Sequence, residues 1–512
     1  MAESRDLRAN GGERGIPPQV RQDPKYIAAF HIVRTLRSSG HQAYFAGGCV
    51  RDLLLGLAPK DYDVATSATP DQVVSLFPKT FAVGAHFGVI LVCTPSGDEK
   101  DIAVEVATFR NDGAYSDGRR PDAVKFSTDP REDVLRRDFT INGMLLDPVK
   151  LEETGDLHAS VLDFVGGRRD LENKLVRAIG EPALRYTEDK LRLLRAVRFA
   201  ARLNFTLDET AIRELAPQIT QVSAERIRDE LTRILTEGGA RRGFELLDSL
   251  GLLARILPEA VRMHGVAQPP QYHPEGDVWT HTMLLLEKLP VESSSSERSP
   301  IREASRTARS ASPTLAWGAL LHDIGKPATY QPPNPAIPGD RIRFNGHVEV
   351  GVRITEEICA RLRFSNDETA QIVALVKNHM RFGDIREMRA STLKRFLRLP
   401  HFEEHLALHR LDVTSAHGDL SLYEIAKAAY EAEPAPDLRP APLLTGRDLI
   451  AAGYPPSPQF KPMLAFAEDA QLEGSVQTRD EALSLVQSHF PRTSQATTGN
   501  ERPPNSLRPG NA

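Results

Sequence analysis

The sequence predicts an α+β protein in which a mixed α/β part at the N-terminal end precedes parts made almost wholly of helix. Up to about residue 150, strand-like runs rich in Val, Ile and Phe alternate with segments of helical periodicity. Beyond about residue 180, almost every segment has helical periodicity. The length of 512 residues provides for roughly three or four domains.

The N-terminal elements are predicted from apolar periodicity. A helix is expected at residues 26–36, where apolar residues recur at helical spacing. A strand is expected to begin at residues 43–45 and to run into a pair of glycines. Two further strands are expected at residues 82–93 and 102–109. This mixture of strands and helices predicts an α/β head.

Changes in composition divide the chain further. A Ser/Arg-rich segment at residues 290–313 predicts a flexible insert, and a Pro-rich segment at residues 432–442 predicts a linker. The polar ends of the chain lack the apolar residues of a core, so we expect disorder there. The predicted parts are a disordered N-terminus (1–24), the α/β head (25–165), a helical neck (166–265), a second helical domain that contains the insert (266–430), a C-terminal helical region (431–490) and a disordered tail (491–512).

Composition excludes several classes of protein. The net charge of −5 excludes a strongly basic chain, so a polyanion would have to bind a local basic surface. Three scattered cysteines exclude a disulfide framework or a zinc ribbon and fit a reducing cytoplasm. No apolar run approaches the roughly 18 residues that span a bilayer, and the N-terminus has no apolar signal core. We therefore predict a cytoplasmic protein without a membrane partner.

Two aspartates one residue apart, Asp61 and Asp63, follow a segment that contains Gly48 and Arg51. Alternate residues of a strand point to the same side, so both carboxylates can converge on one place. Paired carboxylates suit Mg²⁺, which binds one or two of them together with substrate phosphates. The glycine and arginine upstream allow N–H groups and a guanidinium to approach a triphosphate. A lone Asp-x-Asp is more often a solvated loop, so the rest of the chain decides.

A second cluster places a guanidinium, a carboxylate and an amide in one short segment. Arg137, Asp138 and Asn142 are suited to hold a triphosphate, a ribose and base edges together. Taken alone, the charged start of a helix with Asp138 as its cap is the simpler explanation. The glycine-rich, charged segment at residues 108–121 predicts a mobile loop, and Glu105 before it is a candidate third carboxylate.

A third cluster lies on a predicted helix. Asp189 and Arg192 are three residues apart and therefore neighbours on one helix face. Such a pair is suited to read the Watson–Crick edge of a base. Arg195 and Arg198 continue the row, but each step of three residues drifts backwards by about 60°, which places Arg198 better for phosphates or for structure. Taken alone, ordinary ion pairs on an amphipathic helix explain the cluster.

Five ordered motifs resemble those of class II CCA-adding tRNA nucleotidyltransferases, and bacterial poly(A) polymerases share much of the pattern. They are GGCVRDLLLG with KDYDVATSATP, TFRNDGAYSDGRRPD, RRDFTINGM, DFVGGRRDL and EDKLRLLRAVRFAARL. The later segment ERIRDELTRIL resembles the last head-and-neck motif of the family. The resemblance covers about residues 25–265 and implies a nucleotidyltransferase head of the polymerase-β superfamily. One departure is Gly143, where the family usually has alanine.

The resemblance also implies a reaction, in which an RNA 3′-OH attacks the α-phosphorus of a nucleotide and pyrophosphate leaves. Asp61 and Asp63 would be the catalytic ligands of two Mg²⁺ ions in the head. The predicted nucleotide-binding residues are Gly48, Arg51 and Arg137 for the triphosphate, Asp189 and Arg192 for the C or A base, Arg195 and Arg198 to complete the site, and Asp138 and Asn142 from the second cluster. The protein itself would serve as the template.

A separate metal pattern follows in the second helical domain. A single His on an apolar helix is more often a core residue, but an adjacent His-Asp pair with three more histidines and a distal aspartate can build a metal site. The candidate ligands are His281, His322, Asp323, His347, His379 and Asp412. The pattern resembles the HD phosphohydrolase superfamily, which implies hydrolysis of cyclic or terminal phosphates. We expect one or two ions of a divalent transition metal whose identity the sequence leaves open.

The leading hypothesis is a CCA-adding enzyme that uses CTP and ATP to add C, C and A to the 3′ end of tRNA. The alternative within this class is a poly(A) polymerase or an enzyme that adds only CC or only A, and the loop at residues 108–121 favours an enzyme able to add A. The alternative of another class is an HD metal-dependent phosphohydrolase whose head only binds RNA, and the complete head motifs argue against it. The sequence predicts no oligomeric state.

Overall fold

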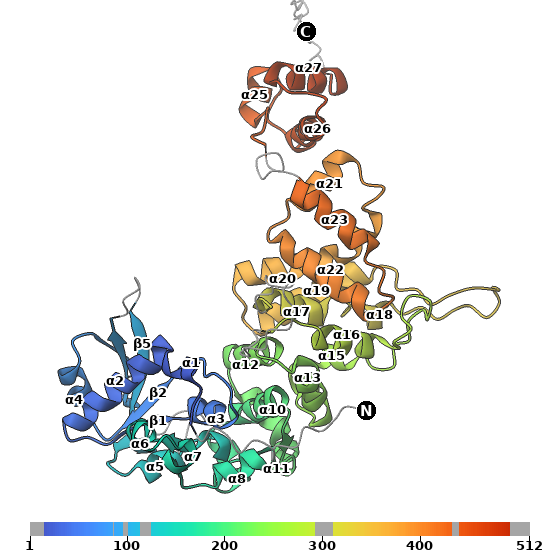
Figure 1. Cartoon of the computed structure of the whole chain (residues 1–512). Coiled ribbons are helices and arrows are strands. Elements are labelled where there is room, and N and C mark those ends of the chain that lie inside the picture. The colour runs from blue at the N-terminus through green and yellow to red at the C-terminus, as the bar shows by residue number, and fades with distance from the viewer. Residues whose placement is uncertain are drawn as a thin grey trace, which may run out of the picture. The chain divides into compact units, whose positions relative to one another are not determined.

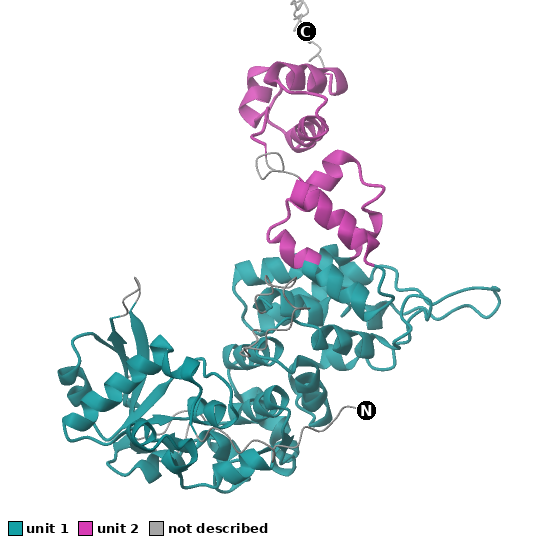
Figure 2. Cartoon of the chain, in the orientation of Figure 1, with its two compact units in different colours: residues 1–379, 407–419 teal, residues 380–406, 420–512 magenta. Residues whose placement is uncertain are grey.

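The computed structural model describes residues 15–84, 87–95, 101–112, 124–291, 311–432 and 440–491. It contains two compact units. The first comprises residues 1–379 and 407–419, and the second comprises residues 380–406 and 420–512 (Figure 2). The predicted loop at 108–121, insert at 290–313, linker at 432–442 and tail at 491–512 fall largely outside the described residues.

The first unit begins with a head built on a seven-stranded sheet (Figure 1). Its strand order is β3-β4-β5-β2-β1-β8-β9, and only the pair of β2 and β5 is parallel within it. The strands are β1 (Ala43–Ala46), β2 (Asp63–Thr66), β3 (Thr80–Gly84), β4 (Val89–Thr94), β5 (Ile102–Thr108), β8 (Met144–Leu146) and β9 (Val161–Asp163). Two small sheets pair β6 (Arg110–Asp112) with β7 (Val124–Phe126) and β10 (Leu175–Val176) with β11 (Thr206–Leu207).

Helix α2 (Pro24–Ser38) packs on β1, β2 and β5 and confirms the helix predicted at residues 26–36. Asp23 caps its first turn by accepting a hydrogen bond from the Lys25 N–H, and Pro24 occupies the first turn, where its missing N–H is not needed. The other helices of the head are α1 (Pro18–Arg21), α3 (Gly48–Leu54), α4 (Pro70–Leu76), α5 (Pro130–Leu135), the 3₁₀ helix Thr140–Asn142, α6 (Pro148–Thr154), α7 (Leu157–Ser160) and α8 (Gly167–Glu172).

The rest of the first unit is helical, as predicted. Its first helices are α9 (Pro182–Glu188), α10 (Leu191–Leu203), α11 (Thr210–Leu215), the 3₁₀ helix Ala216–Gln221, α12 (Ala224–Thr236), α13 (Ala240–Ser249), α14 (Leu253–Ile256) and α15 (Pro258–Val261). They are followed by α16 (Val278–Glu287), α17 (Pro313–Leu321), α18 (Lys326–Thr329), α19 (His347–Arg361) and α20 (Asn366–Asn378). The 3₁₀ helix His379–Asp384 begins at the last residue of this segment, and its other residues belong to the second unit. A large cluster of buried apolar residues runs from the head through these helices, and a smaller one in the head includes Phe109 and Val134.

Two core clusters lie in the second unit. One gathers Phe382, Phe396 and Phe402, and the other gathers Leu449 and Val486 with their neighbours. The helices of this unit are α21 (Ala390–Leu397), α23 (Ser421–Ala432), α25 (Gly446–Ala451), α26 (Phe460–Leu472) and α27 (Arg479–His489), and α22 (Phe402–Ser415) contributes residues to both units.

The structure confirms the predicted fold class and corrects two details. The segment expected to form one strand at residues 82–93 forms β3 and β4, which pair as neighbours after a turn at Gly88 with φ +81°. Within the N-terminus expected to be disordered, α1 is formed and Ile16 and Val20 are buried. The domain boundaries given above remain predictions.

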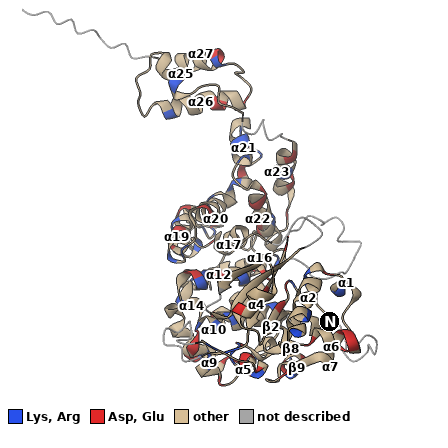
Figure 3. Cartoon of the chain, turned by 90° about the vertical axis from the view of Figure 1, so that its left-hand side faces the viewer, with Lys and Arg blue, Asp and Glu red and all other residues tan. Residues whose placement is uncertain are grey.

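Surface chemistry follows the composition. Basic and acidic residues are interspersed along the helices (Figure 3), in keeping with the small net charge.

All three cysteines, Cys49, Cys93 and Cys359, are free and buried. In the part of the chain that the structure describes, no helix combines the length and the apolar character that crossing a membrane requires.

Candidate functional site

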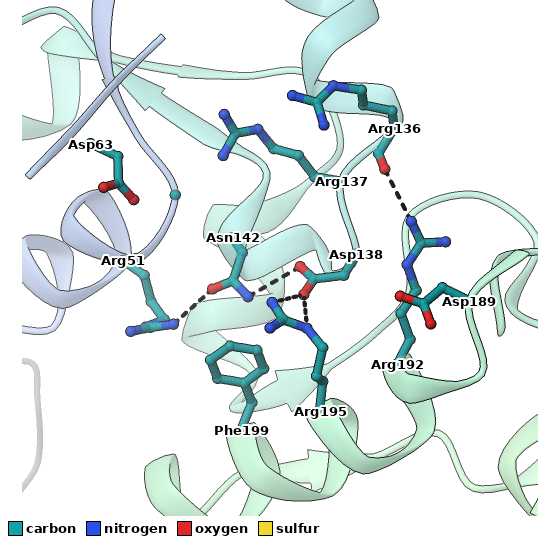
Figure 4. Close-up of a pocket in the computed structure, with 12 residues that line it drawn as sticks. Arg51, Asp63, Arg136, Arg137, Asp138, Asn142, Asp189, Arg192, Arg195 and Phe199 are labelled. Atoms are coloured by element: carbon teal, nitrogen blue, oxygen red, sulfur yellow. Dashed lines mark hydrogen bonds and ion pairs between the residues drawn. The ribbon is translucent and has the colours of Figure 1, made fainter. Parts of the chain in front are cut away.

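A cavity of about 420 Å³ in the first unit brings together most of the residues predicted to bind a nucleotide (Figure 4). Its lining residues are Gly47, Gly48, Arg51, Asp63, Arg136, Arg137, Asp138, Asn142, Asp189, Arg192, Arg195 and Phe199. They come from the head, from the junction after α9 and from the neck helix α10. The fold thus brings together residues that lie more than a hundred positions apart in the sequence.

The glycines at the start of α3 make room for an arginine. Gly47 has φ +77°, which only glycine adopts readily, and a Cβ there would lie 3.2 Å from an Nη atom of Arg137. The other side of the Arg137 guanidinium bonds to Asp133, with Nη2 2.9 Å from Oδ2. Asp133 is fully buried and also pairs with Arg136. The Asp133 carboxylate therefore orients two arginines that line the cavity. This residue was not predicted from the sequence.

Hydrogen bonds connect four predicted residues across the cavity floor (Figure 4). Arg51 donates to Asn142 Oδ1 at 2.7 Å, and the Asn142 amide donates to Asp138 Oδ1 at 3.3 Å. Asp138 Oδ2 accepts from Arg195 Nε at 2.9 Å. Burial alone would raise the pKa of Asp138, but Arg195 and the other donors hold it below its usual value. The Asp138 carboxylate is therefore charged, and it orients Arg195 rather than capping a helix.

Asp63 is the predicted metal ligand that reaches the cavity. It opens β2, and the pairing of Val64 with Val106 sets it beside Glu105 on the parallel strand β5. Crowding by protein atoms and the Glu105 carboxylate raise the pKa of Asp63 to about 6, although Arg137 opposes the shift. The charges of Glu105 and Asp61 thus both act on Asp63, and a carboxylate in such an environment gains from a nearby divalent cation.

The expected placement of Asp61 is wrong in one respect. Strand β2 begins at Asp63, so Asp61 precedes the strand and the two do not alternate along it. The Asp61 carboxylate is solvent-exposed and accepts a hydrogen bond from Lys25 Nζ at 2.8 Å. It is still close enough to Asp63 to raise its pKa.

Asp189 and Arg192 both line the cavity, but they do not share a helix. Asp189 lies in the extended junction after α9, and α10 begins two residues later, so the predicted continuous helix is wrong at this point. Arg226 from α12 binds both Asp189 oxygens, at 3.1 and 2.7 Å. Arg192 pairs with Glu188 at 2.6 Å. Arg226 belongs to the last family motif, which was the available signal for it.

Arg198 does not reach the cavity. Its guanidinium is buried and pairs with Glu230 at 2.7 Å and Glu237 at 2.9 Å, so it joins α10 to α12. Helical drift placed Arg198 better for phosphates or for structure, and these ion pairs give it a structural role. Phe199 lines the cavity instead, with the Arg51 guanidinium 5.3 Å from its ring.

Gly143 ends the 3₁₀ helix Thr140–Asn142 rather than interrupting a long helix. A Cβ at this position would lie 2.8 Å from Ile179 Cδ1 and 3.0 Å from Val165 Cγ2. Alanine, which the family usually has here, would require these side chains to move. The packing around Gly143 in this chain is therefore close enough to favour a residue without a Cβ.

The six ligands predicted in the second helical domain converge, and we call them the HD cluster. Two groups of three can each surround an ion, with ligand atoms within 4.8 Å of one another: His281, His322 and Asp412, and Asp323, His347 and His379. Nε2 of His281 lies 3.0 Å from Asp412 Oδ1, and Nε2 of His347 lies 3.4 Å from Nε2 of His379. Five helices or helix ends supply these side chains.

The HD cluster has the chemistry of a divalent-metal site. Asp323 Oδ1 is buried without a hydrogen-bond partner among the described residues, and it lies 3.7 Å from His379 Nε2. A buried carboxylate oxygen without a hydrogen-bond partner is stabilised by a bound cation. Burial lowers the pKa of His379 to about 4, so that its imidazole is neutral and able to bind a metal. The residues present therefore fit such an ion.

Three residues beside the HD cluster escaped the sequence interpretation. Glu275 Oε1 lies 2.6 Å from His281 Nδ1 and 2.9 Å from His273 Nδ1. Burial disfavours the charged form of His281, but hydrogen bonds with Asp412 and Glu275 raise its pKa to about 9. Lys326 Nζ lies 2.7 Å from Asp323 Oδ2. The His-Pro-Glu segment just before His281 was a signal that could have identified Glu275.

Comparison with known families agrees with this geometry. Residues 43–177 match the family described as poly A polymerase head domain, residues 204–263 match a probable RNA and SrmB-binding site of polymerase A, and residues 278–416 match the HD domain. Along the chain, a segment similar to poly A polymerase heads and a segment similar to a probable RNA-binding site thus precede a segment similar to the HD domain. The resemblance seen in the sequence is confirmed.

Individual relatives narrow the comparison to CCA-adding enzymes. The chain is 41% identical over 232 residues to the CCA-adding enzyme of Geobacillus thermodenitrificans. The match covers 45% of this chain and 54% of the relative. The chain is 37% identical over 276 residues to that of Lactobacillus helveticus, which covers 52% of this chain and 65% of the relative. The chain therefore spans about half the length of the first of these relatives.

Solved structures agree over a longer span. A Bacillus stearothermophilus CCA-adding enzyme in complex with CTP has a TM-score of 0.63 and 24% identity, over 91% of this chain and 98% of that chain. A CCA-adding enzyme in complex with ATP has a TM-score of 0.55 and 18% identity, over 92% of this chain and 98% of that chain. At these identities the likeness concerns the fold alone.

Proposed function

We propose that the protein adds C, C and A to the 3′ end of tRNA from CTP and ATP, without a nucleic-acid template. The observation that carries this proposal is the single cavity that holds Asp63, the arginines for a triphosphate, and Asp189 with Arg192. A metal carboxylate beside phosphate-binding groups suits nucleotidyl transfer, and an acceptor–donor pair suits the choice of a base. The proposed tRNA substrate and the free cysteines fit a cytoplasmic protein.

Each residue has a distinct part in the proposed reaction. Asp61, Asp63 and Glu105 would hold Mg²⁺, which would supply positive charge to the attacking and leaving oxygens. Arg51 and Arg137, supported by Asn142 and Asp133, hold the triphosphate in place. The other cavity residues orient the nucleotide, with Asp189 and Arg192 at the Watson–Crick edge and Asp138 fixing Arg195.

Incorporation of labelled nucleotides tests this proposal. The protein is incubated with Mg²⁺, a tRNA that lacks its terminal CCA, and labelled CTP or ATP. Addition of C, C and A followed by a stop is expected. A long A tail without C would identify a poly(A) polymerase, and addition of CC or of A alone would identify a partial enzyme. An absence of incorporation would contradict the transferase proposal.

The HD cluster supports a second activity, metal-dependent hydrolysis of a phosphate ester. The observation in favour is the buried Asp323 Oδ1, which has no hydrogen-bond partner among the described residues and lies beside the neutral imidazole of His379. We propose that the two groups of three ligands bind two divalent transition-metal ions. Their proposed substrates are cyclic or terminal phosphates.

Paired variants test the division of labour. Replacing Asp61 and Asp63 by alanine should abolish incorporation and leave ring opening of a 2′,3′-cyclic phosphate intact. Replacing His322 and Asp323 by alanine should have the opposite effect. Loss of both activities in either variant, with folding retained, would contradict two separate centres.

A further inference from the structure

The four histidines of the HD cluster differ in the group that holds their Nδ1 atom. Nδ1 of His322 lies 2.9 Å from the Ala319 carbonyl. His347 and His379 make the same contact with the carbonyls three residues before them, at 2.9 and 2.7 Å. A ring that donates Nδ1–H in this way presents its Nε2 lone pair to a metal.

His281 is the exception, because a carboxylate takes the place of the carbonyl. Its Nδ1 lies 2.6 Å from Glu275 Oε1, while its Nε2 faces Asp412. His281 is completely buried, and the Glu275 side chain is only 8% exposed. A negative charge held this close in a dry site polarises the imidazole more than a carbonyl does, which makes Nε2 a stronger ligand.

We propose that Glu275 is a positioning residue that makes the two metal subsites of the HD cluster unequal. It fixes the Nδ1–H form of His281 and strengthens the ion that His281, His322 and Asp412 hold. The subsite of Asp323, His347 and His379, in which a backbone carbonyl faces Nδ1 of both histidines, is the weaker of the two. This inference rests on the proposal that the HD cluster binds divalent ions.

Further contacts place Glu275 for this role. The same Oε1 atom lies 2.9 Å from His273 Nδ1, so two rings grip one carboxylate oxygen. The His273 ring packs edge-on against the His281 ring, with centroids 4.8 Å apart. The His322 ring also packs edge-on against the His281 ring, with centroids 5.4 Å apart. The imidazole of His281 therefore has little freedom to turn, and its two nitrogens keep their assignments.

Titration with Co²⁺ tests the inference. The protein carrying Asp61→Ala and Asp63→Ala, which remove two of the three proposed metal ligands of the head, serves as the parent. Calorimetry should resolve a tight and a weak Co²⁺ site. Glu275→Gln and Glu275→Leu should weaken the tight site by about 10- to 100-fold, the usual effect of removing such a partner, and leave the weak site unchanged.

Asp277→Asn is the matched control. Asp277 lies two residues away and caps α16 by accepting a hydrogen bond from the Thr280 N–H at 2.8 Å. It should lower stability without changing either Co²⁺ affinity. A spectroscopic readout is independent of stability: the paramagnetic NMR spectrum should show exchangeable Nδ1–H signals of bound histidines, and Glu275→Leu should lose or shift the signal of His281 selectively.

The outcomes are distinct. Unchanged affinity in both Glu275 variants, equal weakening of the two sites, or the same effect from Asp277→Asn would each overturn the inference. A parent with two equal sites would also overturn it. A parent that binds no Co²⁺ at all would overturn the proposed metal site itself, and the inference would fall with it.

Discussion

Asp63 shows how neighbouring residues set the working range of a metal ligand. Its raised pKa of about 6 means that protons compete with a cation well above the usual range of an aspartate. We expect the Mn²⁺ affinity of the head to fall as the pH drops from about 7 to about 5, because only the charged carboxylate binds metal. Electron paramagnetic resonance of free Mn²⁺ measures this, with His322 and Asp323 replaced by alanine to silence the HD cluster.

Glu105→Gln provides the comparison for that profile. It removes the like charge that helps to raise the pKa of Asp63, so the fall in affinity should move to lower pH whatever the affinity at neutral pH. If Mn²⁺ binding by the parent stays constant down to about pH 5, Asp63 is not held in the environment described here.

Arg226 supports Asp189, one of the two residues that we propose to read the base. It grips both oxygens of Asp189 from a different helix and so fixes the direction of the carboxylate. We expect Arg226→Ala to reduce kcat/KM for CTP and ATP by at least about tenfold, or about 1.4 kcal/mol, and to increase incorporation of wrong nucleotides. Steady-state kinetics with each of the four nucleotides measures both effects.

Arg228→Ala is the control on the same helix, because the Arg228 guanidinium pairs with Asp229 and not with Asp189. Fidelity should be unchanged in this variant. An Arg226→Ala protein that discriminates among nucleotides as well as the parent does would show that Asp189 needs no support from α12.

One buried carboxylate on helix α5, that of Asp133, forms ion pairs with two arginines. Asp133 is fully buried and pairs with Arg136 and Arg137 just beyond the end of the helix. Asp133→Asn leaves the guanidinium groups without their counter-charge, and we expect it to lower the free energy of unfolding by about 3–5 kcal/mol. Urea unfolding followed by circular dichroism measures this loss.

The pH dependence adds a second criterion for α5. Burial opposes ionisation of Asp133, but the two arginines lower its pKa below the unfolded value. The stabilisation is therefore complete at neutral pH and is lost as the pH falls through the folded pKa, below about 4. The difference between parent and Asp133→Asn should shrink in acid, whereas Glu132→Gln on the same helix should change little at any pH.

Elements were predictable where local pattern and tertiary packing agree. In α2, the residues that recur at helical spacing form the apolar face that packs on the sheet. The strands β1 and β5 were likewise predicted from their apolar residues. One strand was predicted where β3 and β4 form, because Val and Phe lie on both sides of the turn. The helix predicted through Asp189 breaks there, where the carboxylate is held by Arg226, a contact that no local pattern contains.

At the scale of the whole molecule, the sites were predictable as sets of residues but not as geometries. The motifs identified Arg51, Asn142 and Arg195, and the fold adds the hydrogen bonds that connect them through Asp138. Residues that support others, such as Asp133 and Glu275, have no motif of their own and become visible only through their contacts. Arg198 shows the converse, since its motif position suggested a ligand contact and the structure gives it a packing role.

The HD cluster joins helices that lie far apart in the sequence, from α16 to α22, so an ion bound there should stabilise their assembly. A ligand that binds only the folded state at about 100 times its Kd adds about 2.7 kcal/mol. We expect Co²⁺ to raise the thermal midpoint of the parent and EDTA to reverse the effect, as followed by scanning calorimetry. The protein with Asp61→Ala and Asp63→Ala should keep this response, and one with His347→Ala and His379→Ala should lose most of it. An equal response in both variants would place the stabilising ion outside the HD cluster.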